Sequence, residues 1–160
     1  MAADGRAGTA VVAVSRPGCE LALRLQRGLP DVTLFLPERF TPAASAGVHR
    51  WSAPLRELIG RLFAEYGGLV LFGSVGMAVR LVTPLVRDKR TDPAVVVVDD
   101  GGWFAVSLLS GHLGGANTLA ARVADVLHAR SVITTASDAL GTVAVDLGND
   151  DLPRLGVLGA

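Results

Sequence analysis

The sequence SLLSGHLGGANTLA at residues 107–120 joins an apolar run to a glycine-rich polar turn, and that turn to an amphipathic helix. From Ala116 as far as Leu127, apolar residues recur at helical spacing, which predicts a helix with one buried face. A strand followed by a glycine turn and a helix is typical of α/β domains. We therefore expect an α/β fold and test the remaining segments against it.

The same alternation runs through the rest of the chain. Short apolar runs predict strands, and apolar residues at helical spacing predict helices. The expected strands are 11–14, 32–36, 69–72 and 131–134, and the expected helices span 21–29, 55–66 and 78–86, with a loop at 37–51. Ser52 is the expected N-cap of the second helix, Gly67-Gly68 its end, and Pro84 should kink or split the third.

Asp99-Asp100-Gly101-Gly102 lies between apolar runs at 95–98 and 103–109. This turn sequence predicts a β-hairpin and not a helical crossover. The whole pattern predicts a three-layer, Rossmann- or flavodoxin-like α/β fold with a mixed, mainly parallel sheet, helices on both faces and one β-hairpin. Because ligands of such sheets bind beyond strand carboxyl ends, we expect the loops after residues 72, 109 and 134 to share one edge.

Composition narrows the function classes. The 160 residues suit one domain, and 15 basic residues balance 15 acidic ones, so no global charge favours nucleic acid or a membrane surface. With no membrane-span or signal-peptide pattern, we expect a cytoplasmic protein. One cysteine, Cys19, excludes a disulfide framework, and three widely separated histidines form no metal-binding motif.

The glycine turn is a candidate anion site. A helix N-terminus favours a carboxylate or phosphate, and Ser110, His112 and Asn117 add polar side chains. The alternative is a tight structural turn in which Asn117 caps the helix. The glycine spacing matches neither a Walker loop nor a dinucleotide fingerprint, so nucleotide binding is disfavoured.

A cluster of cations lies upstream of this turn. Arg80, Arg87, Lys89 and Arg90 could clamp several carboxylates. The alternative is a solvated basic helix end. Among the histidines, only His112 lies between glycines at a strand-to-helix junction, so it is the candidate for acid–base chemistry unless it is a turn residue bonded to backbone. After the last strand, Asp138 either joins the site or caps the next turn.

Six segments together resemble the CbiG family of cobalamin-biosynthesis proteins, the cobalt-precorrin-5A hydrolases, in its N-terminal domain. They are SRPG at 15–18, PERF at 37–40, GSVGMAVR at 73–80, DKRTDPAV at 88–95, SLLSGHLGGAN at 107–117 and VITTASD at 132–138. The resemblance covers roughly residues 10–146.

The resemblance implies hydrolytic opening of the ring A lactone of cobalt-precorrin-5A, with loss of the extruded carbon and its methyl group as acetaldehyde. It implies no organic cofactor and no metal ligand, because the substrate, a macrocycle fringed with carboxylates, carries the cobalt. His112 would be the general base, with Asp138 the next candidate. The expected substrate-binding residues are Ser74, Arg80, Lys89, Arg90, Ser110, Gly111, Gly114, Gly115, Asn117 and Thr135.

Family members continue into a middle and a C-terminal domain. We therefore expect a disordered N-terminus at 1–9, a CbiG N-terminal-like domain at 10–146 and a linker or chain end at 147–160. One alternative to an enzyme is a non-catalytic corrinoid-binding domain whose partner is a C-terminal CbiG-type domain or a fused precorrin methyltransferase. Another is a purely structural interaction domain. No nucleic acid or membrane partner is expected.

Overall fold

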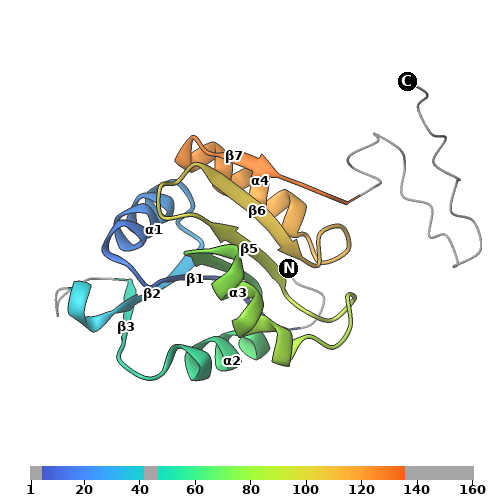
Figure 1. Cartoon of the computed structure of the whole chain (residues 1–160), viewed down its shortest axis with the longest axis horizontal. Helices are drawn as coiled ribbons and strands as arrows, with labels where there is room; N and C mark the ends of the chain where they lie inside the picture. The colour runs from blue at the N-terminus through green and yellow to red at the C-terminus, as the bar shows by residue number, and fades with distance from the viewer. Residues whose placement is uncertain (1–4, 42–46, 136–160) are drawn as a thin grey trace, which may run out of the picture.

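A computed structural model describes residues 5–41 and 47–135, and they form a seven-stranded sheet flanked by helices (Figure 1). The strands are β1 (Ala7–Ala13), β2 (Val32–Pro37), β3 (Val48–Trp51), β4 (Tyr66–Phe72), β5 (Ala94–Val98), β6 (Phe104–Leu109) and β7 (Arg130–Val132). The helices are α1 (Arg16–Gly28), α2 (Leu55–Glu65), α3 (Val75–Val82) and α4 (Ala116–Leu127), with short 3-10 turns at Glu38–Phe40 and Thr83–Leu85.

The sheet order is β3-β2-β1-β4-β5-β6-β7. Strands β1 to β5 pair in parallel, β5 and β6 pair antiparallel, and β6 and β7 are again parallel. The β5–β6 hairpin confirms the turn predicted at residues 99–102, and the mixed, mainly parallel sheet confirms the predicted fold class.

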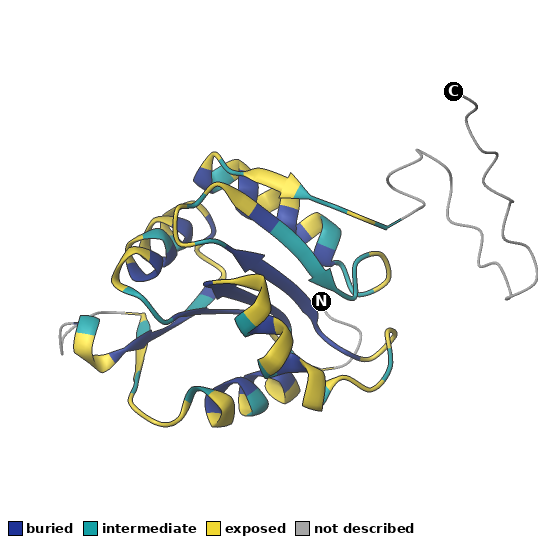
Figure 2. Ribbon diagram, viewed as in Figure 1, coloured by how far each residue is buried: buried dark blue, intermediate teal, exposed yellow. Residues whose placement is uncertain are grey.

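Two apolar cores fill the space on either side of the sheet, because successive strand residues point to opposite faces. Val11 packs with α1 and α4, whereas the next residue, Val12, packs with α2 and α3. Figure 1 shows α1 and α4 on one side of the sheet and α2 on the other. Strand β5 is buried along its whole length and β6 only in part (Figure 2).

Several predicted boundaries were wrong. Residues 48–51 of the expected loop form the edge strand β3, and β1 begins at Ala7 within the tail expected to be disordered. The N-cap of α2 is Pro54, not Ser52, and residues 67–68 lie inside β4 instead of ending the helix. Tertiary pairing overrides local turn signals at such positions. The split at Pro84 is confirmed, because α3 ends at Val82 and a 3-10 turn follows.

The expectation of one shared functional edge was also wrong. Strands β6 and β7 run opposite to β4 and β5, so the loops after Phe72 and Leu109 lie at opposite edges of the sheet. We call the edge where β1, β2, β4 and β5 end the carboxyl edge. The opposite edge, where β6 and β7 end, is the glycine-loop edge. The hairpin therefore separates residues that the sequence placed together.

In the hairpin turn, the Asp99 carboxylate accepts hydrogen bonds from three backbone amides. They are the amides of Gly101 at 3.0 Å, Trp103 at 3.0 Å and Phe104 at 2.7 Å. Asp99→Ala leaves all three without this acceptor, and we expect it to lower the free energy of unfolding by about 2 kcal/mol. Urea denaturation measures the loss. Asp125→Ala, at an exposed carboxylate of α4, is the control, and an equal effect of both substitutions would contradict the role of Asp99.

The single cysteine is a buried core residue. Cys19 is 4% exposed, and burial raises the pKa of its thiol despite the nearby Arg39. Because the thiolate is the reactive form, we expect a thiol reagent to modify the folded chain far more slowly than the chain in denaturant. Equal rates under the two conditions would show that Cys19 is accessible in the folded protein.

Candidate functional site

The glycine loop between β6 and α4 owes much of its composition to close packing. Ser110 has a φ of 58° and Gly115 a φ of 84°, both in the left-handed region. A Cβ on Gly114 would lie 2.3 Å from the Ser110 Cβ and 2.7 Å from the Ser110 carbonyl oxygen. A Cβ on Gly111 would lie 2.9 Å from an Asn117 oxygen. Only glycine lets this loop fold so tightly on itself.

The first amides of α4 are already occupied. The Ala116 amide donates to the Ser110 carbonyl at 3.1 Å, and the Asn117 amide donates to the Gly111 carbonyl at 3.0 Å. The N-cap, Gly115, has no side chain that could accept a hydrogen bond. An anion at this helix end would therefore depend on the remaining loop amides and on His112, whose side chain is exposed.

Asn117 does not cap the helix, which was the structural alternative for this residue. Its side-chain oxygen accepts a hydrogen bond from the Ser107 hydroxyl at 2.7 Å, and its side-chain nitrogen donates to the Thr135 hydroxyl at 2.9 Å. These bonds tie together β6, α4 and the segment that follows β7. A register shift between β5 and β6 lies beside Ser107, as is common where a strand positions a functional side chain.

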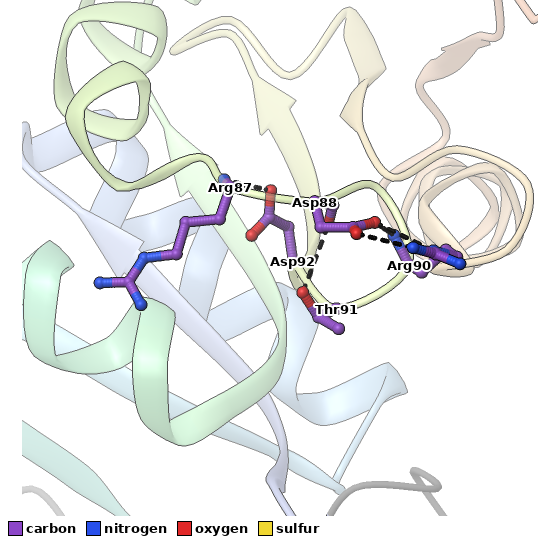
Figure 3. Close-up of polar contacts among 5 residues, drawn as sticks. All are labelled: Arg87, Asp88, Arg90, Thr91 and Asp92. Carbon is purple, nitrogen blue, oxygen red and sulfur yellow. Dashed lines mark hydrogen bonds and ion pairs between the residues drawn. The ribbon is translucent and has the colours of Figure 1, made fainter.

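The loop at residues 87–92 lies against the glycine loop. The Ser110 hydroxyl donates to the Asp92 carbonyl at 3.1 Å. The buried Asp92 carboxylate accepts a hydrogen bond from the Arg87 amide at 2.9 Å, and Asp88 faces Arg90 (Figure 3). The Arg90 guanidinium approaches Asp88 to 3.1 Å, and this hydrogen bonding lowers the pKa of Asp88. Asp88 thus offsets the charge of Arg90, and both Arg90 and Lys89 are exposed.

Two of the predicted binding residues lie elsewhere. Ser74 is the N-cap of α3 at the carboxyl edge, where its hydroxyl accepts from the Met77 amide at 3.2 Å. The Arg80 guanidinium folds back to the Gly76 carbonyl at 3.0 Å, toward the same end of the helix. Asp138 lies outside the described residues. The segments at the glycine-loop edge contain the following predicted site residues: Lys89, Arg90, Ser110, Gly111, His112, Gly114, Gly115, Asn117 and Thr135.

The sequence analysis missed a second surface, at the carboxyl edge. An open cavity of about 530 Å³ is lined by Trp103, Phe104, His128, Ala129 and Arg130. Trp103 is 71% exposed and Phe104 46% exposed. The signal was present in the sequence, because an aromatic pair directly follows the predicted hairpin turn, but both residues were assigned only to the strand at 103–109.

The described part of the chain contains neither a metal-binding cluster of side chains nor a helix that could span a membrane. Within residues 5–41 and 47–135, no three His, Cys, Asp or Glu side chains are grouped so that they could hold a metal ion. In these same ranges, no helix has the length and apolar character needed to cross a membrane.

Comparison with known proteins shows the family to which the chain belongs. A family model described as "Cobalamin synthesis G N-terminal" matches residues 57–138, which include the glycine loop. The cobalt-precorrin-5A hydrolase of Priestia megaterium is 43% identical over 140 residues, 86% of this chain and 37% of that protein. The Salmonella typhimurium protein of the same name is 42% identical over 135 residues, 81% of this chain and 37% of its own length.

A solved structure of a cobalamin biosynthesis protein G homolog from Sulfolobus solfataricus has the same fold. Its TM-score is 0.58 at 22% sequence identity, and the match covers 81% of this chain and 37% of that one. The chain thus spans 37% of the length of the two curated relatives. It belongs to the cobalamin synthesis G N-terminal family.

Proposed function

We propose that this chain acts in cobalamin biosynthesis as the N-terminal part of a cobalt-precorrin-5A hydrolase. The observation that carries the proposal is the 43% identity over 86% of the chain to a relative of that name. The glycine-loop edge supplies the corresponding chemistry, since it combines a histidine, hydroxyl groups and cations. We place the protein in the cytoplasm and assign it no organic cofactor, with cobalt carried by the substrate.

In the proposed reaction, water adds to the carbonyl carbon of the ring A lactone while His112 accepts a proton from that water. The ester C–O bond then breaks and yields a carboxylate and a hydroxyl on the extruded carbon. Loss of the hydroxyl proton and cleavage of the bond between that carbon and the macrocycle release acetaldehyde. The electron pair stays on the macrocycle, which takes up a proton.

The loop backbone would stabilise the negative charge that develops on the lactone oxygen. Because the Ala116 and Asn117 amides already donate to loop carbonyls, we assign this role to the amides of Gly114 and Gly115. Ser110 and Thr135 would orient the substrate through their hydroxyls. Lys89 and Arg90 would pair with its peripheral carboxylates.

A second candidate function is a corrinoid-binding domain that a partner completes. The occupied amides of α4 favour it, because they leave the loop fewer donors for an oxyanion. The partner would be a C-terminal CbiG-type domain or a precorrin methyltransferase. Release of acetaldehyde from cobalt-precorrin-5A by this chain alone supports the enzyme, whereas release only after the remaining domains of a relative are added supports the binding domain.

We expect His112→Gln to lower turnover of the assembled, active enzyme by about 10²- to 10⁴-fold, the usual contribution of general acid–base catalysis. Acetaldehyde formation under saturating substrate measures it. Corrinoid binding and the free energy of unfolding should not change, since His112 is exposed. His49→Gln, on the edge strand β3, is the matched control. Unchanged turnover in the His112 variant would exclude this residue as the base and direct attention to Asp138.

We expect Lys89→Gln to weaken binding of a corrinoid that carries free carboxylates by about tenfold at low salt, the lower end for a charge-assisted contact. The loss should shrink as salt screens the charges. Arg27→Gln, at the exposed end of α1, is the control. Equal affinities of the Lys89 variant and the unsubstituted chain at low salt would remove Lys89 from the site.

A further inference from the structure

Within residues 5–41 and 47–135, part of the sheet has no helix packed on one of its faces. Helix α4 packs on β6 and β7 from one side, whereas on the other side α2 packs on β4 and α3 on β5. Val106 pairs with Val97, and Val97 belongs to the α2 and α3 core, so Val106 points to this second face. Phe104, two residues away, points to the same face. Because β5 and β6 join through a hairpin, no crossover helix covers these residues.

Trp103 and Phe104, at the start of β6, are exposed, and hydrogen bonds hold their backbone in place. Trp103 and Phe104 donate their amides to Asp99, and the Trp103 carbonyl accepts from the Arg130 amide at 2.8 Å. Trp103 is 71% exposed and Phe104 46% exposed, so both rings lie largely outside the core. Adjacent exposed aromatics of this size are typical of recognition surfaces. We call Trp103, Phe104, His128 and Arg130 the aromatic platform.

Two basic residues, Arg130 and His128, line the same cavity as the aromatic rings of the platform. Arg130 is the register partner of Phe104 on the neighbouring parallel strand, so its side chain leaves the sheet on the same face. His128 is the C-cap of α4 and lines the same cavity of about 530 Å³. Asp99 accepts the turn amides and Asp100 accepts the Ser15 hydroxyl at 2.7 Å, so hydrogen bonds hold both carboxylates in the turn while they keep their charge. The platform itself presents broad apolar rings with Arg130 beside them, and this guanidinium can pair with a carboxylate of a ligand.

We infer that the aromatic platform binds the face of a carboxylate-bearing tetrapyrrole. The rings of Trp103 and Phe104 contact the macrocycle, and Arg130 and His128 pair with its peripheral carboxylates. This inference rests on the proposed function and adds a second contact region to it. From Phe104 to Leu109, β6 spans about 17 Å at the usual rise per residue, so a macrocycle with extended side arms on this face approaches the glycine loop.

The test titrates the chain with dicyanocobyrinic acid, a corrinoid with free carboxylates, and with its heptamethyl ester, which keeps the ring and loses the charges. We expect Trp103→Ala to weaken binding of both probes by about tenfold, because the ring contact is common to both. Arg130→Gln should weaken binding of the acid alone. Leu23→Ala, at an exposed apolar residue of α1, and Arg27→Gln are the matched controls.

Thermal unfolding of each variant shows that the fold is intact. Unchanged affinity of both platform variants for the acid, with binding still weakened by Lys89→Gln, would overturn the platform and leave the proposed function standing. If the unsubstituted chain binds neither probe, the inference fails, and acetaldehyde release by the assembled enzyme decides the function separately. If Trp103→Ala abolishes self-association in sedimentation experiments while corrinoid affinity stays the same, the platform contacts a second copy and the inference is overturned.

Discussion

The antiparallel β5–β6 hairpin is the constraint on which the rest of the structure depends. The Asp99 carboxylate holds the turn through three amides, and this turn reverses the direction of the last two strands of an otherwise parallel sheet. Because β6 runs backward, α4 begins at the edge opposite to the one where α1 and α3 begin. The reversal also removes the crossover helix that would otherwise cover β6. Both candidate binding surfaces follow from this single reversal.

The glycine loop is better described as a tightly bonded junction than as an open anion cradle. Its carbonyls occupy the first amides of α4, and Asn117 joins Ser107 to Thr135 by side-chain hydrogen bonds. A network of this kind orients the groups around it at little entropic cost when a ligand arrives. The glycine loop therefore contributes to the proposed chemistry by holding its side chains in place. Neighbouring segments, such as the loop at residues 87–92, supply the other hydrogen-bond donors and the cations.

Surface charge near this loop is also arranged by local structure. The four cations that the sequence grouped are all exposed. Arg90 pairs with Asp88, Arg80 donates to a carbonyl of its own helix, and the Arg87 guanidinium points away from the Asp88–Arg90 pair (Figure 3). A short run of basic residues thus produces three different electrostatic environments. The 43% identity to a cobalt-precorrin-5A hydrolase over 86% of the chain supports the proposed role in cobalamin biosynthesis. In that proposal the exposed aromatic platform is a second contact surface for the substrate.

The sequence by itself determined the fold class, the hairpin, the helix split at Pro84 and the family, because apolar periodicity, turn chemistry and long specific motifs are local properties. It also located the glycine loop. Only the tertiary structure decided which loops share an edge, since strand direction depends on pairing between distant segments and a hairpin reverses every later strand. For the same reason Ser74 and Arg80 lie away from Ser110, and Trp103 and Phe104, which the pattern assigned to a strand, are exposed at its start.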